Sequence, residues 1–332
     1  MKIAFLNLYS GTNNRGAESF AHKLADKLAK NYQVDFFRGK DFGAPIIQPE
    51  HKRTLLKLFF LDKASLSVLW FTLKIFKDLK DYDWIIPMNG FWQVLLCKFL
   101  RSKILITGHS GPGWDERWNL YLKPDVFVAT TEPTAKWAKK TCPWAKIVTI
   151  PYGIDPIKTK PIKLDLEEPI ILCPAAAVQY KRVELAIKAV AKMKKGSLLH
   201  LGDGPLIAEL KTLGEKLLGK RFLSLIVKHE DVGGYYAASD IVTLPSTSQE
   251  NSPMVFLEAM AAGKYTVTTA APRSKWILGE AGVYVDPTNE TEYAQALEIT
   301  INKKDKTVIE DQLKKYSWKI VLNQYKLIFD KD

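Results

Sequence analysis

Short apolar runs alternate with longer amphipathic segments along the whole chain, and this alternation is the strongest constraint on its fold. Runs such as Ile3–Leu8, Trp84–Pro87 and Val126–Ala129 have the length and composition of strands. Between them, segments such as Gly16–Lys30 carry apolar residues at helical spacing. Strands separated by helices form parallel sheets that helices cover on both faces. The sequence therefore predicts an α/β protein.

One segment interrupts the alternation and has the composition of a linker. Residues 151–163 combine prolines, a glycine and lysines without periodicity. The alternation then resumes at Ile170–Cys173, and the chain ends in a helical tail over Val308–Phe329. A chain of 332 residues is long enough for two domains. We therefore predict a first domain over residues 1–155, a second over 156–305, and a C-terminal helical segment over 306–332.

Composition excludes several classes of protein. The apolar fraction of 47% and the charged fraction of 25% are typical of a globular protein. The three cysteines lack metal-binding spacing and indicate a reducing compartment rather than a disulfide framework. No apolar run is long enough to span a bilayer, and the N-terminus is typical of a strand rather than a signal peptide. We therefore expect a cytoplasmic protein.

Positive charge is concentrated in the first half of the chain. Residues 1–150 hold 23 Lys and Arg against 13 Asp and Glu, whereas residues 151–332 hold 25 against 23. This excess favours an anionic partner for the first half, such as nucleic acid, an acidic membrane face or a phosphorylated acceptor. Solvated lysines that aid solubility are the alternative. No nucleic-acid-binding motif is present, so we expect no nucleic-acid partner.

The segment 51–80 alternates lysines with large apolar and aromatic residues. This pattern fits a helix or helical pair that lies on an anionic bilayer. It also fits a buried helix whose lysine stems cover its rim. The sequence leaves both interpretations open. Under the first, the protein would be peripheral on the inner face of the membrane.

The stretch Gln249–Gly263 is predicted to form a loop followed by a buried helix. Ser252 suits the N-cap, Pro253 the first helical position and Gly263 the position just past the end. The helix between them is apolar nearly all round except for Glu258, and a buried carboxylate needs a partner.

A second acid, Glu250, lies in the loop before this helix. The backbone N–H groups at the helix start lie between Glu250 and Glu258, and they favour an anion. Two acids that flank an anion site suit a pocket for a sugar nucleotide. Pairing of Glu258 with a core Lys or Arg is the alternative.

The same stretch resembles the signature of the retaining glycosyltransferases of family 4. Glu250 and Glu258 are separated by seven residues, Ala-Met-Ala-Ala-Gly follows, and the run 239–246 precedes them as in the family's pattern. The resemblance implies the GT-B fold: two Rossmann-like domains facing across a cleft, and a C-terminal helix that crosses back to the first domain. It also implies a nucleotide-sugar donor bound mainly by the second domain. The acceptor, a glycan or a polyprenyl-linked glycan, would bind the first domain.

The resemblance assigns roles to the residues of this stretch. Glu258 would accept hydrogen bonds from the ribose hydroxyls, because an ionised carboxylate offers two oxygens to two donors. Glu250 would position the sugar ring as a catalytic residue. The backbone of four successive residues would hold phosphate or sugar: Asn251, Ser252, Pro253 and Met254.

No metal and no other cofactor is expected. Asp81 and Asp83 form an Asp-x-Asp pair of the kind that can hold a divalent metal in other transferases. They precede the strand Trp84–Pro87 at its amino end, which is the wrong edge of a parallel sheet for a ligand. We interpret them as turn and capping residues.

The segment 174–182, between a strand and a helix, is the second part of the predicted donor site. The family typically has Gly-Arg here and a Lys about five residues later. Lys181 matches the Lys, whereas Ala176 stands at the Arg position. Lys181, with the adjacent Arg182, would stabilise the departing diphosphate. A solvated Lys-Arg pair that opens a helix is the alternative.

Two loops of the first half complete the predicted site. Gly16 opens a helix in Arg-Gly-Ala-Glu, where the family usually shows Gly-Gly-Ala-Glu, and would let the backbone approach a phosphate or sugar. His109 lies in a glycine-rich loop after a strand, where family members often carry a His that touches the transferred sugar. A neutral imidazole can accept a proton or donate a hydrogen bond. A packing role for His109 is the alternative.

These features together predict a retaining, metal-independent glycosyltransferase that takes a nucleotide sugar. Two alternatives remain open. One is a phosphorylase or sugar-nucleotide epimerase with the same fold. The other is a non-catalytic partner subunit, for which Ala176 and the basic 51–80 segment argue.

Overall fold

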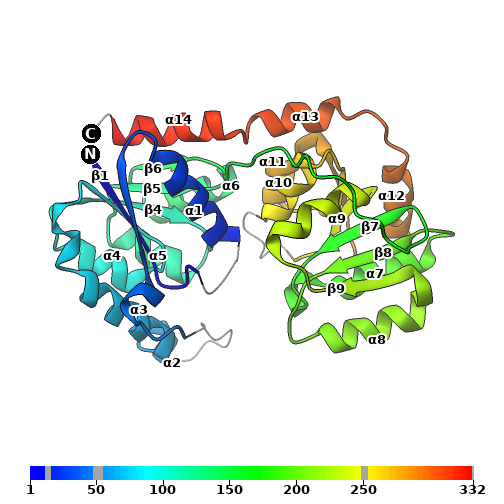
Figure 1. The fold of residues 1–332 in the computed structure, drawn as a ribbon, viewed down its shortest axis with the longest axis horizontal. Helices are drawn as coiled ribbons and strands as arrows, with labels where there is room; N and C mark the ends of the chain where they lie inside the picture. Colours follow the sequence, from blue (N-terminus) through cyan, green and yellow to red (C-terminus); the bar gives the residue numbers. More distant parts are fainter. Residues whose placement is uncertain (12–15, 48–54, 248–252, 331–332) are drawn as a thin grey trace. The chain divides into compact units, whose positions relative to one another are not determined.

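The computed structural model describes residues 1–11, 16–47, 55–247 and 253–330 (Figure 1). The chain divides into two compact units, here called unit 1 (Met1–Gly153 with Val321–Asp332) and unit 2 (Ile154–Ile320). Each unit contains a six-stranded sheet in which all the strand pairs are parallel. The predicted α/β class with parallel sheets is confirmed.

The sheet of unit 1 has the strand order β2-β1-β3-β4-β5-β6. Its central strands are buried on both faces, as the continuous apolar runs predict. The strands are β1 Lys2–Asn7, β2 Gln33–Arg38, β3 Trp84–Pro87, β4 Lys103–Gly108, β5 Val126–Ala129 and β6 Ile147–Thr149. The helices are α1 Gly16–Leu28, α2 Leu55–Leu58, α3 Lys63–Ile75, α4 Phe91–Cys97, α5 Trp114–Tyr121, α6 Glu132–Thr141 and α14 Trp318–Phe329.

The sheet of unit 2 has the strand order β12-β11-β10-β7-β8-β9. Its strands are β7 Ile170–Pro174, β8 Ser197–Leu201, β9 Phe222–Leu225, β10 Ile241–Leu244, β11 Thr266–Thr269 and β12 Gly282–Val285. Its helices are α7 Val183–Lys192, α8 Ile207–Leu218, α9 Val232–Ala238, α10 Met254–Ala261, α11 Pro272–Leu278, α12 Glu290–Ile301 and α13 Thr307–Lys314.

The strand order reverses once in each sheet, and this decides where a ligand can bind. In unit 1 the chain passes from β1 to β2 on one side and returns to β3 on the other. In unit 2 the same reversal separates β7 from β10. The loops that leave the carboxyl ends of these neighbours run to opposite sides, and ligands of such sheets bind in the crevice between them.

Helix α10 is buried as predicted, but its first turn differs from the prediction. Pro253 is the N-cap rather than the first helical residue, with φ −67° and ψ 120°, and the helix starts at Met254. The predicted cap Ser252 lies outside the described residues. Gly263 follows the helix with φ 68°, and its N–H donates to Met260 O at 2.9 Å. This confirms Gly263 as the terminating residue, because φ is positive there.

The predicted helical tail is interrupted, so a single helix over Val308–Phe329 is wrong. The break falls between α13 and α14, where Tyr316 O accepts the N–H of Ile154 at 2.9 Å instead of a helical N–H. The Tyr316 hydroxyl donates to Ile277 O at 2.9 Å and holds the break inside unit 2. Beyond it, α14 packs on unit 1, where the Phe329 ring lies 5.3 Å from the Trp84 ring (Figure 1).

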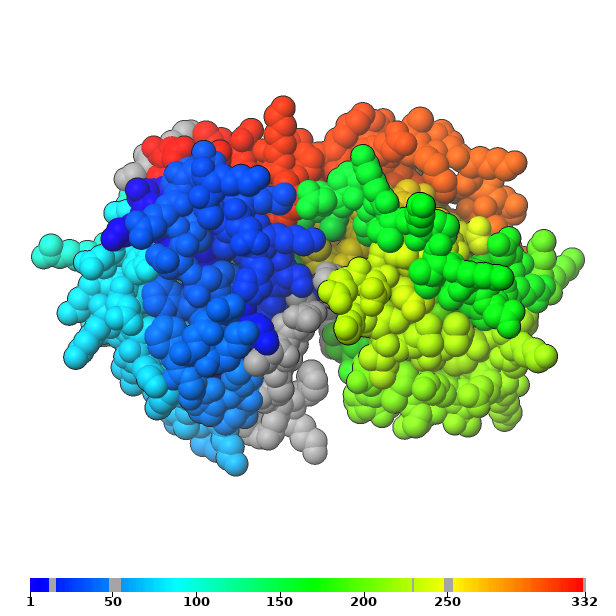
Figure 2. Space-filling model, viewed as in Figure 1, coloured from blue at the N-terminus to red at the C-terminus, as the bar shows by residue number. Residues whose placement is uncertain are grey.

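The structure supports burial for one face of the segment 55–80, and its membrane role stays a prediction. Helix α3 buries Val68, Phe71 and Ile75 in the core of unit 1. Its other face exposes Leu66, Trp70 and Leu73, and the residues just before it expose further apolar side chains. Figure 2 shows this part of the chain, in mid-blue, at the surface of unit 1. Within the described ranges, no helix combines the length and the apolar character that crossing a bilayer requires.

A close approach between two loops of unit 2 requires glycine at position 202. A Cβ built on Gly202, just after β8, would overlap the carbonyl oxygen of Ala175, just after β7. We expect Gly202→Ala to lower the free energy of unfolding by about 1–3 kcal/mol, because backbone must move to relieve the overlap. Urea denaturation followed by tryptophan fluorescence measures the change.

The matched control for this variant is Gly113→Ala. A Cβ there would lie 3.8 Å from its nearest neighbour, which is ordinary contact. An unchanged unfolding midpoint for Gly202→Ala would contradict the close approach.

Candidate active site

The loops at the strand reversal of unit 2 bring the second-half site residues to one edge of the sheet. The loop after β7 carries Lys181 and Arg182, and the loop after β10 starts at Pro245. Thr247 N donates to Tyr180 O at 2.8 Å, so the two loops are joined directly. The predicted residues Glu250, Asn251 and Ser252 belong to the second loop but lie outside the described residues.

Arg182 fixes the geometry of this edge. Its Nε donates to Pro245 O at 2.8 Å, and its Nη2 donates to Ser246 O and to Thr269 Oγ1, both at 3.1 Å. The guanidinium thus joins the ends of β10 and β11. Arg182 itself has a φ of 51°, a left-handed conformation that is uncommon for a residue with a side chain. These contacts identify a positioning role that the sequence did not reveal, whereas its role in binding the donor stays a prediction.

Lys181 lies beside the start of α7. It is half-buried, and its Nζ lies 5.3 Å from the centroid of the Tyr180 ring. The N-cap of α7, Arg182, makes no side-chain capping bond. The positive end of this helix and the ammonium group therefore act together and favour an anion.

Glu258 is half-buried on α10, and a neutral partner holds it. The Tyr236 hydroxyl donates to Glu258 Oε2 at 2.8 Å. Tyr236 is fully buried, and burial together with the Glu258 charge raises its pKa well above the ordinary value. Among the residues that the structure describes, no Lys, Arg or His forms an ion pair with Glu258. The alternative, pairing with a core base, is therefore not observed there, and Oε1 can accept from a ligand.

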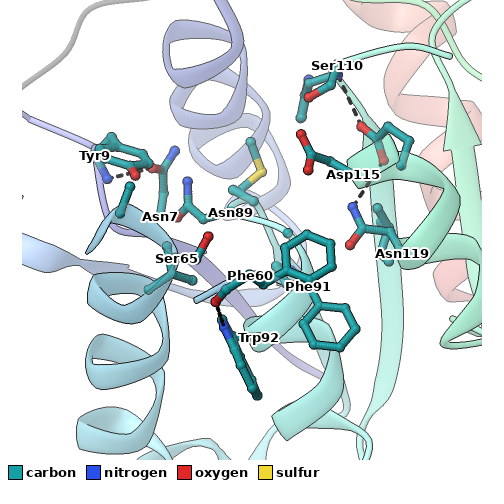
Figure 3. Close-up of a pocket in the computed structure, with 18 of the residues that line it drawn as sticks. Asn7, Tyr9, Phe60, Ser65, Asn89, Phe91, Trp92, Ser110, Asp115 and Asn119 are labelled. Atoms are coloured by element: carbon teal, nitrogen blue, oxygen red, sulfur yellow. Dashed lines mark hydrogen bonds between the residues drawn. The ribbon is translucent and has the colours of Figure 1, made fainter. Parts of the chain in front are cut away.

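The first-half site residues surround a pocket at the strand reversal of unit 1. This cavity of ≈ 350 Å³ lies at the carboxyl ends of β1, β3 and β4 (Figure 3). Ala17 and Glu18, which directly follow Gly16 at the start of α1, are among its lining residues, and so is His109. Amides, acids and aromatic side chains also line the pocket: Asn7, Asn89, Asn119, Asp115, Glu116, Phe60, Phe91 and Trp92.

His109 is neutral at ordinary pH. Its Nδ1 lies 2.6 Å from the Tyr152 hydroxyl, and burial lowers the pKa of the imidazole to about 4. A neutral imidazole can exchange hydrogen bonds with a sugar without carrying a charge. Tyr152 is buried, although it falls in the segment 151–163 that the sequence indicates as a linker. The sequence did not reveal this partner, because the linker pattern of the segment gives no indication that Tyr152 is buried.

Glu116 is a buried acid that lines the unit 1 pocket. It is 3% exposed, and its two oxygens accept from Ser110 N at 3.1 Å and from Asn119 Nδ2 at 3.2 Å. Burial outweighs these two bonds and raises the pKa of Glu116 to about 7. Because Ser110 follows His109 directly, Glu116 also fixes the loop that carries the imidazole.

Aromatic side chains form one wall of the pocket. The Phe60 and Phe91 rings stack at 4.4 Å with an angle of 5°, and Trp92 Nε1 donates to Phe60 O at 2.8 Å. These contacts hold Phe60 at a φ of 57°, where a side chain is strained. The wall was not predicted from the sequence, because Phe60 and Phe91 lie on separate elements that only the fold brings together.

Asp83, the second acid of the pair before β3, makes a structural contact, whereas the predicted turn and capping roles of the pair stay a prediction. Asp83 Oδ2 accepts the N–H of Lys2 at 2.7 Å, at the amino end of the sheet. Within the described part of the chain, no group of three or more His, Cys, Asp or Glu side chains has the arrangement of a metal site. The absence of a metal requirement stays a prediction.

Two family models match the chain and together cover most of it. Glycosyltransferase Family 4 matches residues 14–158, and Glycosyl transferases group 1 matches residues 168–303. The chain belongs to the group 1 glycosyltransferases of family 4. The family suggested by residues 250–263 is thereby confirmed.

Relatives of this glycosyltransferase include an uncharacterized glycosyltransferase of Haemophilus influenzae, 29% identical over 328 residues that make up 91% of this chain and 90% of the relative. An exopolysaccharide phosphotransferase of Streptomyces coelicolor is 31% identical over 183 residues, 52% of this chain. The chain spans only 19% of the length of that relative.

Among solved structures, HepE of Anabaena in complex with UDP-glucose is similar in fold. The TM-score is 0.76 at 18% sequence identity, and the similarity covers 100% of both chains. At this identity the likeness concerns the fold alone. It confirms the predicted GT-B fold class.

The raised pKa of Glu116 predicts a stability that depends on pH. The folded pKa of about 7 exceeds the ordinary value of 4.5, so the folded protein loses stability as pH rises through this window. A shift of this size corresponds to a loss of about 3 kcal/mol in the free energy of unfolding. This loss is absent well below pH 4.5 and complete above about pH 7. Glu116→Gln stays neutral, and the Asn119 amide can rotate to accept its N–H. We therefore expect the variant to gain stability relative to the parent on going from pH 5 to pH 8.

Denaturant titrations of both proteins at pH 5 and pH 8 measure this difference. Asp115→Asn, at an exposed neighbouring carboxylate on the same helix, is the control and should show no comparable change. Equal stability differences for Glu116→Gln at the two pH values would show that Glu116 ionises freely in the folded protein.

Proposed function

We propose that this protein transfers a sugar from a nucleotide-sugar donor to a glycan or lipid-linked acceptor. The observation that carries the proposal is Glu258, a half-buried carboxylate that a tyrosine hydroxyl holds and that no described base neutralises. Such a group is stable only if something polar completes its hydrogen bonding. The ribose of a nucleotide offers two adjacent hydroxyls that meet this need. The UDP-glucose complex of the structurally similar HepE supports a nucleotide sugar as the ligand.

Lys181 would carry the electrostatic part of the reaction. When the bond between sugar and diphosphate breaks, negative charge grows on the diphosphate. A cation and a helix start that already face that position lower the energy of the transition state without reorganising. The guanidinium of Arg182 is engaged with Pro245, Ser246 and Thr269, so it is less suited to replace the family Arg that Ala176 lacks. Lys181 is thus the main cation of this loop in the proposed mechanism.

The remaining predicted site residues keep their proposed roles. Gly16 would let the start of α1 approach the ligand closely. Glu250 would position the sugar ring, and the backbone from Asn251 to Met254 would hold phosphate or sugar. His109, neutral and beside the unit 1 pocket, would contact the transferred sugar by hydrogen bonding.

We further propose that the reaction retains the anomeric configuration and needs no divalent metal. Nuclear magnetic resonance of the product gives the configuration directly, and inversion would refute the first statement. Turnover in excess chelator tests the second, and we expect it to be unchanged. Conversion of a nucleotide sugar without any acceptor would instead indicate an epimerase.

Substitutions in the proposed donor site should have different effects at Lys181 and at Arg182, which are adjacent in the chain. We expect Glu258→Ala and Lys181→Ala each to reduce transfer by about 10²-fold or more, because each removes a strong charge contact. Lys181→Ala should leave the unfolding midpoint unchanged. Arg182→Ala should lower it, because its three hydrogen bonds between loops are lost. Steady-state kinetics, nucleotide titration calorimetry and thermal unfolding measure the three effects.

The calorimetric control is Lys188→Ala, at a half-buried lysine on α7 that pairs with Glu290 at 3.6 Å. Nucleotide affinity close to that of the parent for both Glu258→Ala and Lys181→Ala would reject the assigned donor site.

A membrane surface is proposed as the place where the acceptor is met. In α2 and the turn that follows it, the chain exposes Leu56 by 57% and Phe59 by 62%. Tertiary hydrogen bonds hold this turn, since Trp114 Nε1 donates to Leu58 O at 3.1 Å and Trp92 Nε1 to Phe60 O. The same segment also exposes four lysines: Lys63, Lys74, Lys77 and Lys80. An ordered apolar turn in a segment with exposed lysines suits the cytoplasmic face of an anionic bilayer.

We expect the protein to sediment with vesicles that contain phosphatidylglycerol and much less with phosphatidylcholine alone. The double variant Leu56→Ser, Phe59→Ser should abolish most of this binding, because its apolar contact with the acyl region is lost. Phe99→Ser is the control, because Phe99 is 75% exposed on unit 1 outside the segment. Binding that ignores lipid charge, or survives the double variant, would count against a membrane role for this segment.

A further inference from the structure

The unit 1 pocket presents hydrogen-bond donors on one side. The Oδ1 atoms of Asn7 and Asn89 accept the backbone N–H groups of Tyr9 at 3.0 Å and of Leu8 at 2.6 Å. Gln93 Oε1 accepts the N–H of Asn89 at 2.8 Å and so fixes the turn after β3. With both carbonyl oxygens engaged, the two asparagines have their NH₂ groups available for a ligand.

The opposite side of the pocket presents acceptors. Asn119 is 5% exposed and donates its Nδ2 to Glu116, while its Oδ1 is buried with no hydrogen-bond partner within the described part of the chain. The Asp115 carboxylate lies beside it (Figure 3). A buried acceptor without a partner is unfavourable, so a hydroxyl that donates to Asn119 Oδ1 would stabilise the pocket.

The lining charges disfavour an anion. Among the described lining residues, the acids are Glu18, Asp62, Asp115 and Glu116, whereas the base is Lys57. His109 adds no charge, because burial keeps its imidazole neutral. A phosphate or carboxylate in this cavity would face like charges at short range in a partly desolvated space. The pocket therefore differs from the rest of its unit, in which basic residues predominate.

We propose that this pocket binds one uncharged sugar residue of the acceptor. Its hydroxyls would accept from Asn7 and Asn89 and donate to Asn119 Oδ1, since a hydroxyl does both. The apolar face of the ring would pack on Phe91, in the aromatic wall (Figure 3). A cavity of ≈ 350 Å³ is at the lower end of the range of small-molecule sites, about 300–1,000 Å³, and suits one ring.

The proposal rests on the proposed function and adds the chemical class of the group that accepts the sugar. Phosphates of a lipid-linked acceptor would then lie outside this cavity. Burial raises the pKa of Glu116 to about 7, so the like charge that an anion would face comes mainly from Glu18, Asp62 and Asp115.

The test is a binding panel on the full chain by saturation-transfer resonance and calorimetry. Three neutral probes are the methyl glycosides of glucose, galactose and N-acetylglucosamine. Two anionic probes of the same size are glucose 6-phosphate and methyl glucuronide. We expect at least one neutral glycoside to bind, and both anionic probes to bind at least about tenfold more weakly than it, as unfavourable desolvation of a charge predicts. Binding of an anionic probe as tight as the neutral ones, or no binding of any neutral glycoside, would overturn the proposal.

Two variants locate the binding. Asn119→Ala should weaken the neutral glycoside about tenfold, because its buried acceptor is lost. Asp115→Asn, at an exposed position that tolerates change, should weaken it by a few-fold and covers the case in which Asn119→Ala does not fold. Asn31→Ala, on an exposed turn after α1, should change nothing. Equal affinity for the parent, Asn119→Ala and Asp115→Asn would place the sugar elsewhere and reject the assignment.

A parallel titration with UDP-glucose separates this inference from the proposed function. If neutral glycosides bind in the pocket but no nucleotide sugar binds the chain, the pocket assignment stands and the transferase proposal fails. If nucleotide sugars bind and are turned over only with acceptors whose terminal residue is anionic, the transferase stands and the neutral-sugar pocket is wrong.

Discussion

The structure depends on the reversal of strand order in two parallel sheets. Because every strand of a parallel sheet ends at the same edge, the loops after β1, β3, β7 and β10 all start at carboxyl ends, and each reversal separates neighbouring loops. In unit 1 the space so formed is the pocket with its amides and aromatic wall. In unit 2 the same geometry brings Lys181 next to the loop after β10, and Arg182 ties that loop to two strands.

Burial sets the chemistry of both candidate sites. His109 is neutral because burial disfavours the charged imidazole, and Glu116 is only partly ionised at neutral pH for the same reason. Glu258 is half-buried and accepts a hydrogen bond from a tyrosine hydroxyl. In the proposed function the two acids serve different purposes: Glu116 organises a loop beside a pocket, whereas Glu258 offers oxygen atoms to hydroxyls of a ligand.

Much of the fold and part of the site could be predicted from local patterns. Strands such as β3, β5 and β10 were located because short apolar runs bounded by turn residues fit few other structures. Lys181 and Glu258 were singled out because they match the family's pattern, and Glu258 also because it is an acid in an apolar helix; their roles stay predictions. The helical break at Tyr316 was missed, because a contact with Ile154, far away in sequence, competes with the helical hydrogen bond there.

The sequence by itself determined the two α/β units, the helix that carries Glu258, and the position of Lys181 and His109 in loops at carboxyl ends of strands. Only the tertiary structure decided that Arg182 links its loop to the loop after β10 by hydrogen bonds, and that Tyr152 contacts His109. It also brought together the residues that line one pocket: Asn7, Asn89, Asn119, Phe60 and Phe91. The physical reason is that periodicity and caps are properties of neighbours along the chain. A pocket is made by residues whose distance depends on packing between elements, and that packing leaves no pattern in any single segment.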